Sequence, residues 1–91
     1  MTITATGVSP NLMTIAVGAT VTFVNNDTSN HDILGGPDLE HRDCPEIDNV
    51  GFLTPGQSRQ TQVFTRARTC DFHDHVFHTQ TSIFNGRIVI Q

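Results

Sequence analysis

A period-two alternation of apolar and polar residues is the feature that most restricts the fold of this chain. "TITAT" at residues 2–6 and the run from Met13 to Val17 have apolar side chains at every second position, and Val21 and Phe23 continue this pattern. Successive side chains of a β-strand point to opposite faces, so such alternation predicts half-buried strands. Two more strands are predicted at "QTQVFT" and "GRIVIQ", and no window has a convincing helical period.

Turn residues separate these segments at short intervals. Gly7, Pro10 and Gly18 interrupt the first half, and "LTPGQS" has Pro55 and Gly56 where a β-turn prefers them. We therefore expect an all-β, Greek-key β-sandwich of about seven strands. The 91 residues are enough for one small domain, residues 1–91. No apolar run is long enough for a transmembrane helix, so no membrane insertion is expected, and no signal peptide is visible.

Acidic residues are concentrated in the middle of the chain. The segment from Asn25 to Val50 has seven acidic residues and one arginine, a net charge of −6, whereas the whole chain has −4. A nucleic-acid partner is not expected because phosphates require a basic surface. The charge suits a cation or a basic protein partner, and a solvated acidic loop is the alternative. From Gly35 onward this segment is predicted to be a long loop.

The chain has two cysteines, Cys44 and Cys70, which lie 26 positions apart and form no C-x-x-C pair. In a domain this small we favour a disulfide, which would anchor the acidic loop. A disulfide indicates an oxidising compartment, so we expect a periplasmic or extracellular location. The alternative is that Cys70 is a thiolate metal ligand, which leaves Cys44 without a role.

Three of the five histidines lie within "TCDFHDHVFHTQ", residues 69–80. Strand alternation would place His73 and His75 on one face, where two imidazoles can point at one ion, and would place Cys70 on the other face. Neutral imidazole suits copper and zinc among other transition metals. The segment therefore predicts a metal site, and a disulfide would bring His41 towards it.

Several segments resemble one known family in their order along the chain. "AVGATVTFVNNDTSNHDI", "LTPGQS" and "NGRIVIQ" resemble the cupredoxins of the plastocyanin and azurin type. The resemblance implies a cupredoxin-like sandwich that binds copper and transfers electrons. It also implies that His31 occupies the position of the first copper histidine.

The same resemblance implies an unusual metal site. The family pattern places Asp74 at the position of the copper cysteine and Phe84 at that of the methionine. The usual blue copper centre is therefore not expected. "CDFHDH" and "HRDCP" resemble instead a divergent subgroup of copper-binding cupredoxin-like domains with a C-x-F-H-D-H segment.

The predicted ligands are histidines, and copper is the expected ion with zinc as second choice. They are His31, His41, His73 and His75. His78 and Asp74 are further candidates, and Asp74 and Asp32 could instead accept hydrogen bonds from imidazole N–H groups. The remaining aromatic residues are expected in the core: Phe23, Phe52, Phe64, Phe72 and Phe84.

Three function classes follow from these features. The first is a copper-binding module that carries copper or transfers electrons. The second is a small-molecule redox enzyme with an open, histidine-ligated copper, and the third is a metal-free structural or adhesion sandwich. The histidine cluster favours a metal site over the third class. A short chain without an evident pocket-forming segment favours a binding module over an enzyme.

Overall fold

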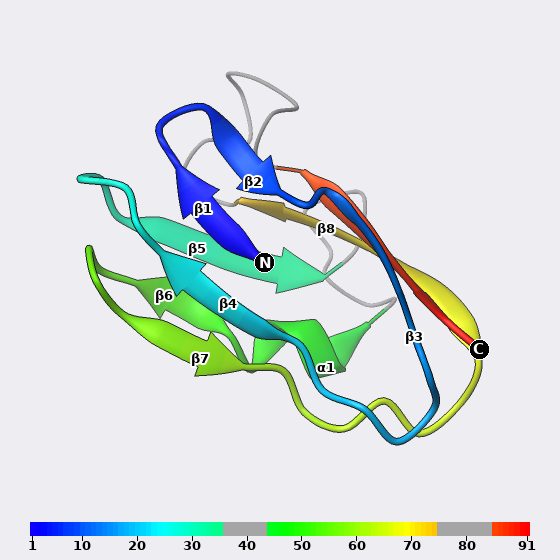
Figure 1. The fold of residues 1–91 in the computed structure, drawn as a ribbon. Coiled ribbons are helices and arrows are strands. Elements are labelled where there is room, and N and C mark those ends of the chain that lie inside the picture. The colour runs from blue at the N-terminus through cyan, green and yellow to red at the C-terminus, as the bar shows by residue number, and fades with distance from the viewer. Residues whose placement is uncertain (36–43, 75–84) are drawn as a thin grey trace.

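Two β-sheets packed face to face make up the fold (Figure 1). The structure, a computed structural model, describes residues 1–35, 44–74 and 85–91. The first sheet has the strand order β2 (Gly7–Ser9), β1 (Thr2–Thr4), β4 (Thr22–Asn25) and β7 (Ser58–Gln60). The second has the order β3 (Leu12–Ile15), β9 (Gly86–Ile90), β8 (Arg68–Asp74), β5 (His31–Gly35) and β6 (Gly51–Leu53).

The predicted all-β sandwich is confirmed. The described ranges contain nine short strands in place of about seven, because the N-terminal segment divides into three. Most neighbouring strands are antiparallel, while β1 pairs in parallel with β4 and β3 with β9. No helix in these ranges is long and apolar enough to cross a membrane.

The core lies between the sheets and follows the alternation in the sequence. Ile3 and Phe23 are buried on the inner face of the first sheet, and Ile33, Phe72 and Ile88 on that of the second. The rings of Phe23 and Phe72 meet edge to face, with centroids 5.1 Å apart and planes at 89°. This geometry is favourable for aromatic pairs, so the contact joins the two sheets at the centre of the core.

A short helix, α1 (Pro45–Asp48), corrects the expectation of a chain without helices. Proline fits the first turn of a helix, where its missing N–H leaves no hydrogen bond unmade. A single four-residue turn is too short to give a periodic pattern, which is why the sequence did not reveal it.

The predicted Cys44–Cys70 disulfide is confirmed, and it ties α1 to β8. The two Cα atoms are 5.8 Å apart, and both residues are completely buried in the core. The chain has no free cysteine, so the alternative of Cys70 as a thiolate ligand is wrong. The backbone of Cys44 also packs directly on Gly35, so a side chain at Gly35 would overlap the Cys44 carbonyl.

Two expectations about the second half of the chain are wrong in part. The strand predicted at "QTQVFT" ends at Gln60, and Phe64 is instead held by backbone hydrogen bonds with Gly18 and Ala19. The prediction that Phe64 is buried is confirmed, but Phe64 does not lie in the predicted strand. Phe52 is 49% exposed because it lies on the outer face of the edge strand β6. Phe84 lies outside the described residues.

Candidate functional site

His31 lies at the start of β5 with its imidazole completely buried and flanked by two carboxylates. Its Nε2 atom is 2.8 Å from Oδ2 of Asp27, and its Nδ1 atom is in direct contact with Oδ2 of Asp74. We call these three residues the Asp27–His31–Asp74 cluster. Asp74 thus lies beside an imidazole nitrogen, as one of its two predicted roles requires, and whether it does so beside a metal-bound histidine stays a prediction.

The register of β5 and β8 explains why Asp74 meets His31. Ile33 pairs with Asp74 across the two strands, so the side chains of both residues lie on the inner face. His31 is two residues from Ile33 and shares that face. The other carboxylate oxygen of Asp74 accepts a hydrogen bond from the backbone N–H of Asp32, at 3.0 Å. Asp32 therefore contributes its backbone to the cluster.

The turn between β4 and β5 positions Asp27. Asn25 ends β4 and is completely buried, and its Oδ1 atom accepts the Asp27 backbone N–H at 2.9 Å. Its Nδ2 atom donates to the carbonyl oxygens of Ser29 and Leu53, each at 3.0 Å. Oδ1 of Asp27 accepts the Thr28 N–H at 2.7 Å, which leaves Oδ2 directed at His31.

The hydrogen bond from His31 favours the ionised form of the Asp27 carboxylate. The hydrogen bond from His31 lowers the pKa of Asp27 below its ordinary value of 3.8, although partial desolvation acts in the opposite direction. A neutral imidazole can donate from only one ring nitrogen, whereas an imidazolium donates from both. Each ring nitrogen of His31 has a carboxylate oxygen beside it, and the position of the ring proton decides which nitrogen donates.

His73 lies on the other face of the second sheet. It pairs with Leu34 across β5 and β8 and is buried, with 4% of its surface exposed. The predicted alternation along β8 is confirmed: Cys70, Phe72 and Asp74 face inward and His73 faces outward. His31 and His73 are thus separated by the sheet. The other candidates, His41, His75 and His78, lie outside the described residues.

A thiolate copper centre does not fit this end of the sandwich. Asp74 stands at the position that the resemblance gives to the copper cysteine, and both cysteines of the chain are in the disulfide. Within residues 1–35, 44–74 and 85–91, no three His, Cys, Asp or Glu side chains converge on a common metal position. Asp27 and Asp74 contact opposite nitrogens of one ring, so they cannot share an ion while both contacts remain.

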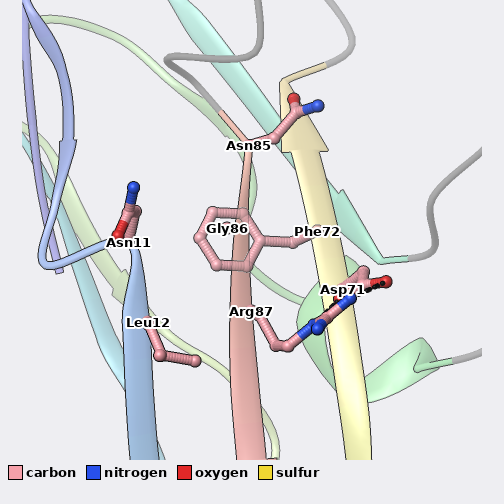
Figure 2. Close-up of a pocket in the computed structure, with 7 residues that line it drawn as sticks. All are labelled: Asn11, Leu12, Asp71, Phe72, Asn85, Gly86 and Arg87. Carbon is pink, nitrogen blue, oxygen red and sulfur yellow. Dashed lines mark hydrogen bonds and ion pairs between the residues drawn. The ribbon is translucent and has the colours of Figure 1, made fainter.

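A second feature, a shallow pocket of about 380 Å³, lies where β3, β8 and β9 meet (Figure 2). The close-up shows the Phe72 ring lying over Gly86 and the Arg87 side chain bonded to Asp71. The Nε atom of Arg87 is 2.6 Å from Oδ1 of Asp71. The pocket has amide, apolar and charged groups in its lining: Asn11, Leu12, Asp71, Phe72, Asn85, Gly86 and Arg87.

Sequence reasoning missed Asp27 and Asn25 as residues of the site. Asp27 stands four positions before His31, but the intervening residues form a turn, so no strand or helix periodicity links the two. The "NND" signature could have indicated it, since Asn side chains commonly hydrogen-bond to the backbone two residues on. Here Asn25 makes that bond to Asp27.

Comparisons with known proteins place the fold among the cupredoxins. No protein-family model matches the chain, and no curated protein matches it in sequence. Among solved structures, it is similar to a purple cupredoxin from Nitrosopumilus maritimus, with 23% identity, a TM-score of 0.67, and coverage of 96% of this chain and 84% of that one.

Two further solved structures are similar to this chain in fold. An oxidised amicyanin variant has 18% identity and a TM-score of 0.72, with coverage of 100% and 81% of the two chains. An oxidised plastocyanin from Dryopteris crassirhizoma has 16% identity and a TM-score of 0.66, with coverage of 90% and 85%. Together with the two-sheet topology, these similarities show that the chain has the cupredoxin fold.

Proposed function

We propose that this protein is a copper-binding domain whose ion is held by nitrogen and oxygen donors, and that it acts in copper carriage or electron transfer. The fold supports the proposal, since an amicyanin variant with the same fold and 18% identity is described with Cu(I). A thiolate ligand is not part of the proposal, because the Cys44–Cys70 disulfide uses both cysteines of the chain.

The ligands expected from the sequence are His31, His41, His73 and His75, with copper as the ion and zinc as the second choice. Because His31 lies on the opposite face of the sheet from His73, we propose that the ion is held on the side of His73, together with His41 and His75. Imidazole and carboxylate donors suit Cu(II) and Zn(II) better than Cu(I), which prefers thiolate and thioether ligands. Copper would supply one-electron redox chemistry when bound. Both ring nitrogens of His31 contact carboxylate oxygens, so His31 would have to give up one of these contacts to bind an ion.

The proposal also covers the domain organisation, the location and the partner of the protein. We assign residues 1–91 to one cupredoxin-like domain of the divergent subgroup that has a C-x-F-H-D-H segment. A periplasmic or extracellular location is supported by the disulfide, since such bonds persist in oxidising compartments. A basic protein partner at the acidic segment is supported by the charge of that segment.

Titration of Cu(II) into the metal-free protein at pH 7, in a buffer that does not chelate copper, tests this function. We expect stoichiometric binding by calorimetry and a weak visible spectrum, because the intense blue absorption requires a thiolate bonded to copper. An intense blue band, or a complete absence of stoichiometric binding, would contradict the proposal.

Alanine variants identify the ligands. His73→Ala and His75→Ala should each weaken binding by at least tenfold, about 1.4 kcal/mol, because each removes a bond to the ion. His78→Ala is the matched control from the same segment and should bind like the parent. If only His78→Ala lost copper binding, His78 and not His73 or His75 would be a ligand.

A metal-free structural or adhesion sandwich is the second candidate function. The contacts of both His31 ring nitrogens with carboxylates favour it, because they satisfy a buried residue without an ion. Metal analysis of protein purified without added metal or chelator separates the two candidates. About one equivalent of copper favours the first function, and less than a tenth of an equivalent of any transition metal favours the second.

A further inference from the structure

The Asp27–His31–Asp74 cluster lies where the chain crosses from the first sheet to the second. Asn25 and Asp27 belong to the end of β4 and the turn that follows it, whereas His31 and Asp74 belong to β5 and β8. The side chains of His31 and Asp74 are completely buried, and that of Asp27 is 8% exposed. The cluster is therefore a buried connection between the two layers.

Every polar atom of the two carboxylates in this cluster has a protein partner. Each carboxylate uses one oxygen for His31 and the other for a backbone N–H, that of Thr28 for Asp27 and that of Asp32 for Asp74. Buried carboxylates are stable only when their oxygens are hydrogen-bonded and their charge is compensated. The first condition is met here for all four oxygens by groups of the chain itself.

Asn25 fixes the position of this arrangement. Its amide bonds to the backbone of Asp27, Ser29 and Leu53, so one buried side chain connects the turn to strand β6 of the second sheet. These bonds preorganise the turn and direct Asp27 at Nε2 of His31. Asn25 is therefore a positioning residue for the cluster.

The two contacts of His31 also disagree with the role that the family resemblance gives it. A metal bond requires the lone pair of one ring nitrogen, and neutral imidazole is the ligand form. In this structure both nitrogens face carboxylate oxygens instead. An ion at His31 would have to displace either Asp27 or Asp74, and each of these is held by a further backbone hydrogen bond.

We propose that Asp27, His31 and Asp74 form a metal-independent tie that closes this end of the sandwich, in the place where the fold family has a metal centre. The tie joins the β4–β5 turn to β8 through a single imidazole ring. It goes beyond the proposed function, because it holds whether or not an ion binds at the outer face near His73.

The first test is NMR spectroscopy of the ¹⁵N-histidine-labelled protein, prepared metal-free with a chelator. The tie predicts that His31 has a slowly exchanging ring proton, and that the ring signals of His31 are the same with and without chelator. A His31 ring whose protons all exchange rapidly with solvent would overturn the proposal. A melting temperature that falls when metal is removed, with a change in the His31 signals, would also overturn it.

Diamagnetic Zn(II) separates this proposal from the function proposed above. If one equivalent of Zn(II) shifts the ring signals of His73 while those of His31 stay unchanged, the tie is supported. If the His31 Nδ1 or Nε2 signal moves to a metal-bound position, the tie is overturned even though metal binding itself is supported. Failure of both Zn(II) and Cu(II) to bind would contradict the proposed function and would agree with the tie.

A double-mutant cycle measures the coupling without any metal. Asp74→Asn and His31→Gln should each reduce the folding equilibrium constant at least tenfold, and the double variant should lose much less than the product of the two. Asp32→Asn is the matched control, since its side chain lies on the outer face of β5 beside the tie. Additive losses would overturn the tie. If these variants do not fold, the NMR measurement on the parent protein decides the question.

Discussion

The Nδ1 atom of His31 contacts the carboxylate of Asp74 across 43 positions of the chain, and both side chains are completely buried. This contact joins β5 and β8 through two polar side chains that lie inside the sandwich. The Nε2 atom of the same ring is 2.8 Å from Asp27, so the environment of His31 is set by two carboxylates from opposite sides. Acid should therefore weaken this region first.

The pKa of Asp27 predicts the direction of that acid effect. Its pKa is lowered by the hydrogen bond from His31, so the stabilisation is complete above the ordinary value of 3.8 and is lost as pH falls through the lower folded-state value. We expect the melting temperature of the parent to fall more steeply than that of Asp27→Asn below about pH 4. Thermal melts between pH 2 and pH 6 by circular dichroism measure this, and parallel curves for the two proteins would contradict it.

The Cys44–Cys70 disulfide should contribute strongly to stability. It closes a loop of 26 positions and holds α1 against β8. The chain-entropy model gives about 3–4 kcal/mol for a loop of this length. We expect denaturant unfolding of the protein with and without reductant to differ by about this free energy.

The control is intact mass after alkylation, which should show no modified cysteine until reductant is added. Two alkylated thiols in protein that never met reductant would show that the bond is absent. A Cys44→Ser, Cys70→Ser double variant should match the reduced protein, since both lack only the cross-link.

Gly86 should tolerate no side chain. A Cβ atom there would overlap the ring of Phe72, and it would lie 2.9 Å from the backbone oxygen of Asn11 (Figure 2). Overpacking of a filled core typically costs about 1–3 kcal/mol, so Gly86→Ala should lower the free energy of unfolding by about that amount. Chemical denaturation measures the loss.

A second substitution shows whether the ring is the cause. Gly86→Ala combined with Phe72→Leu removes the overlap, so its loss should be smaller than the sum of the two single losses. Strictly additive losses would mean that the Phe72 ring moves aside freely and that the space over Gly86 does not limit residue size.

Two arginines of neighbouring strands should differ in their importance. Arg87 on β9 pairs with Asp71 at the surface, with 56% of its side chain exposed, whereas Arg68 on β8 pairs with Glu46 of α1 and is 18% exposed. Exposed ion pairs contribute about 0–1 kcal/mol because solvent screens them. Arg87→Gln should therefore change stability by less than about 0.5 kcal/mol.

Arg68→Gln should cost about 1.5 kcal/mol or more, because it removes a hydrogen bond between charged groups that are largely buried. The two variants carry the same substitution and can be compared directly by denaturant unfolding. Equal losses for Arg68→Gln and Arg87→Gln would show that burial does not strengthen the Arg68–Glu46 pair.

The sequence alone determined the class of fold and the covalent link. Alternation at Ile3, Phe23 and Ile88 predicted which side chains are buried, because the faces of a strand follow directly from a period of two. The Cys44–Cys70 bond was predictable because the chain offers one possible pair. Phe52 was misassigned because an apolar residue on an edge strand looks the same in sequence as one in the core.

Only the tertiary structure decided how the candidate ligands are divided. The register of β5 against β8 places Asp74 beside His31 on the inner face and His73 on the outer face. That register depends on pairing between segments about 40 positions apart, which local periodicity does not contain. The position of Asp27 depends in turn on the buried amide of Asn25, and the hydrogen bond from Asn25 to the Leu53 carbonyl forms only when both sheets are in place. The sequence therefore shows which groups could bind a metal, and the fold determines which of them can meet.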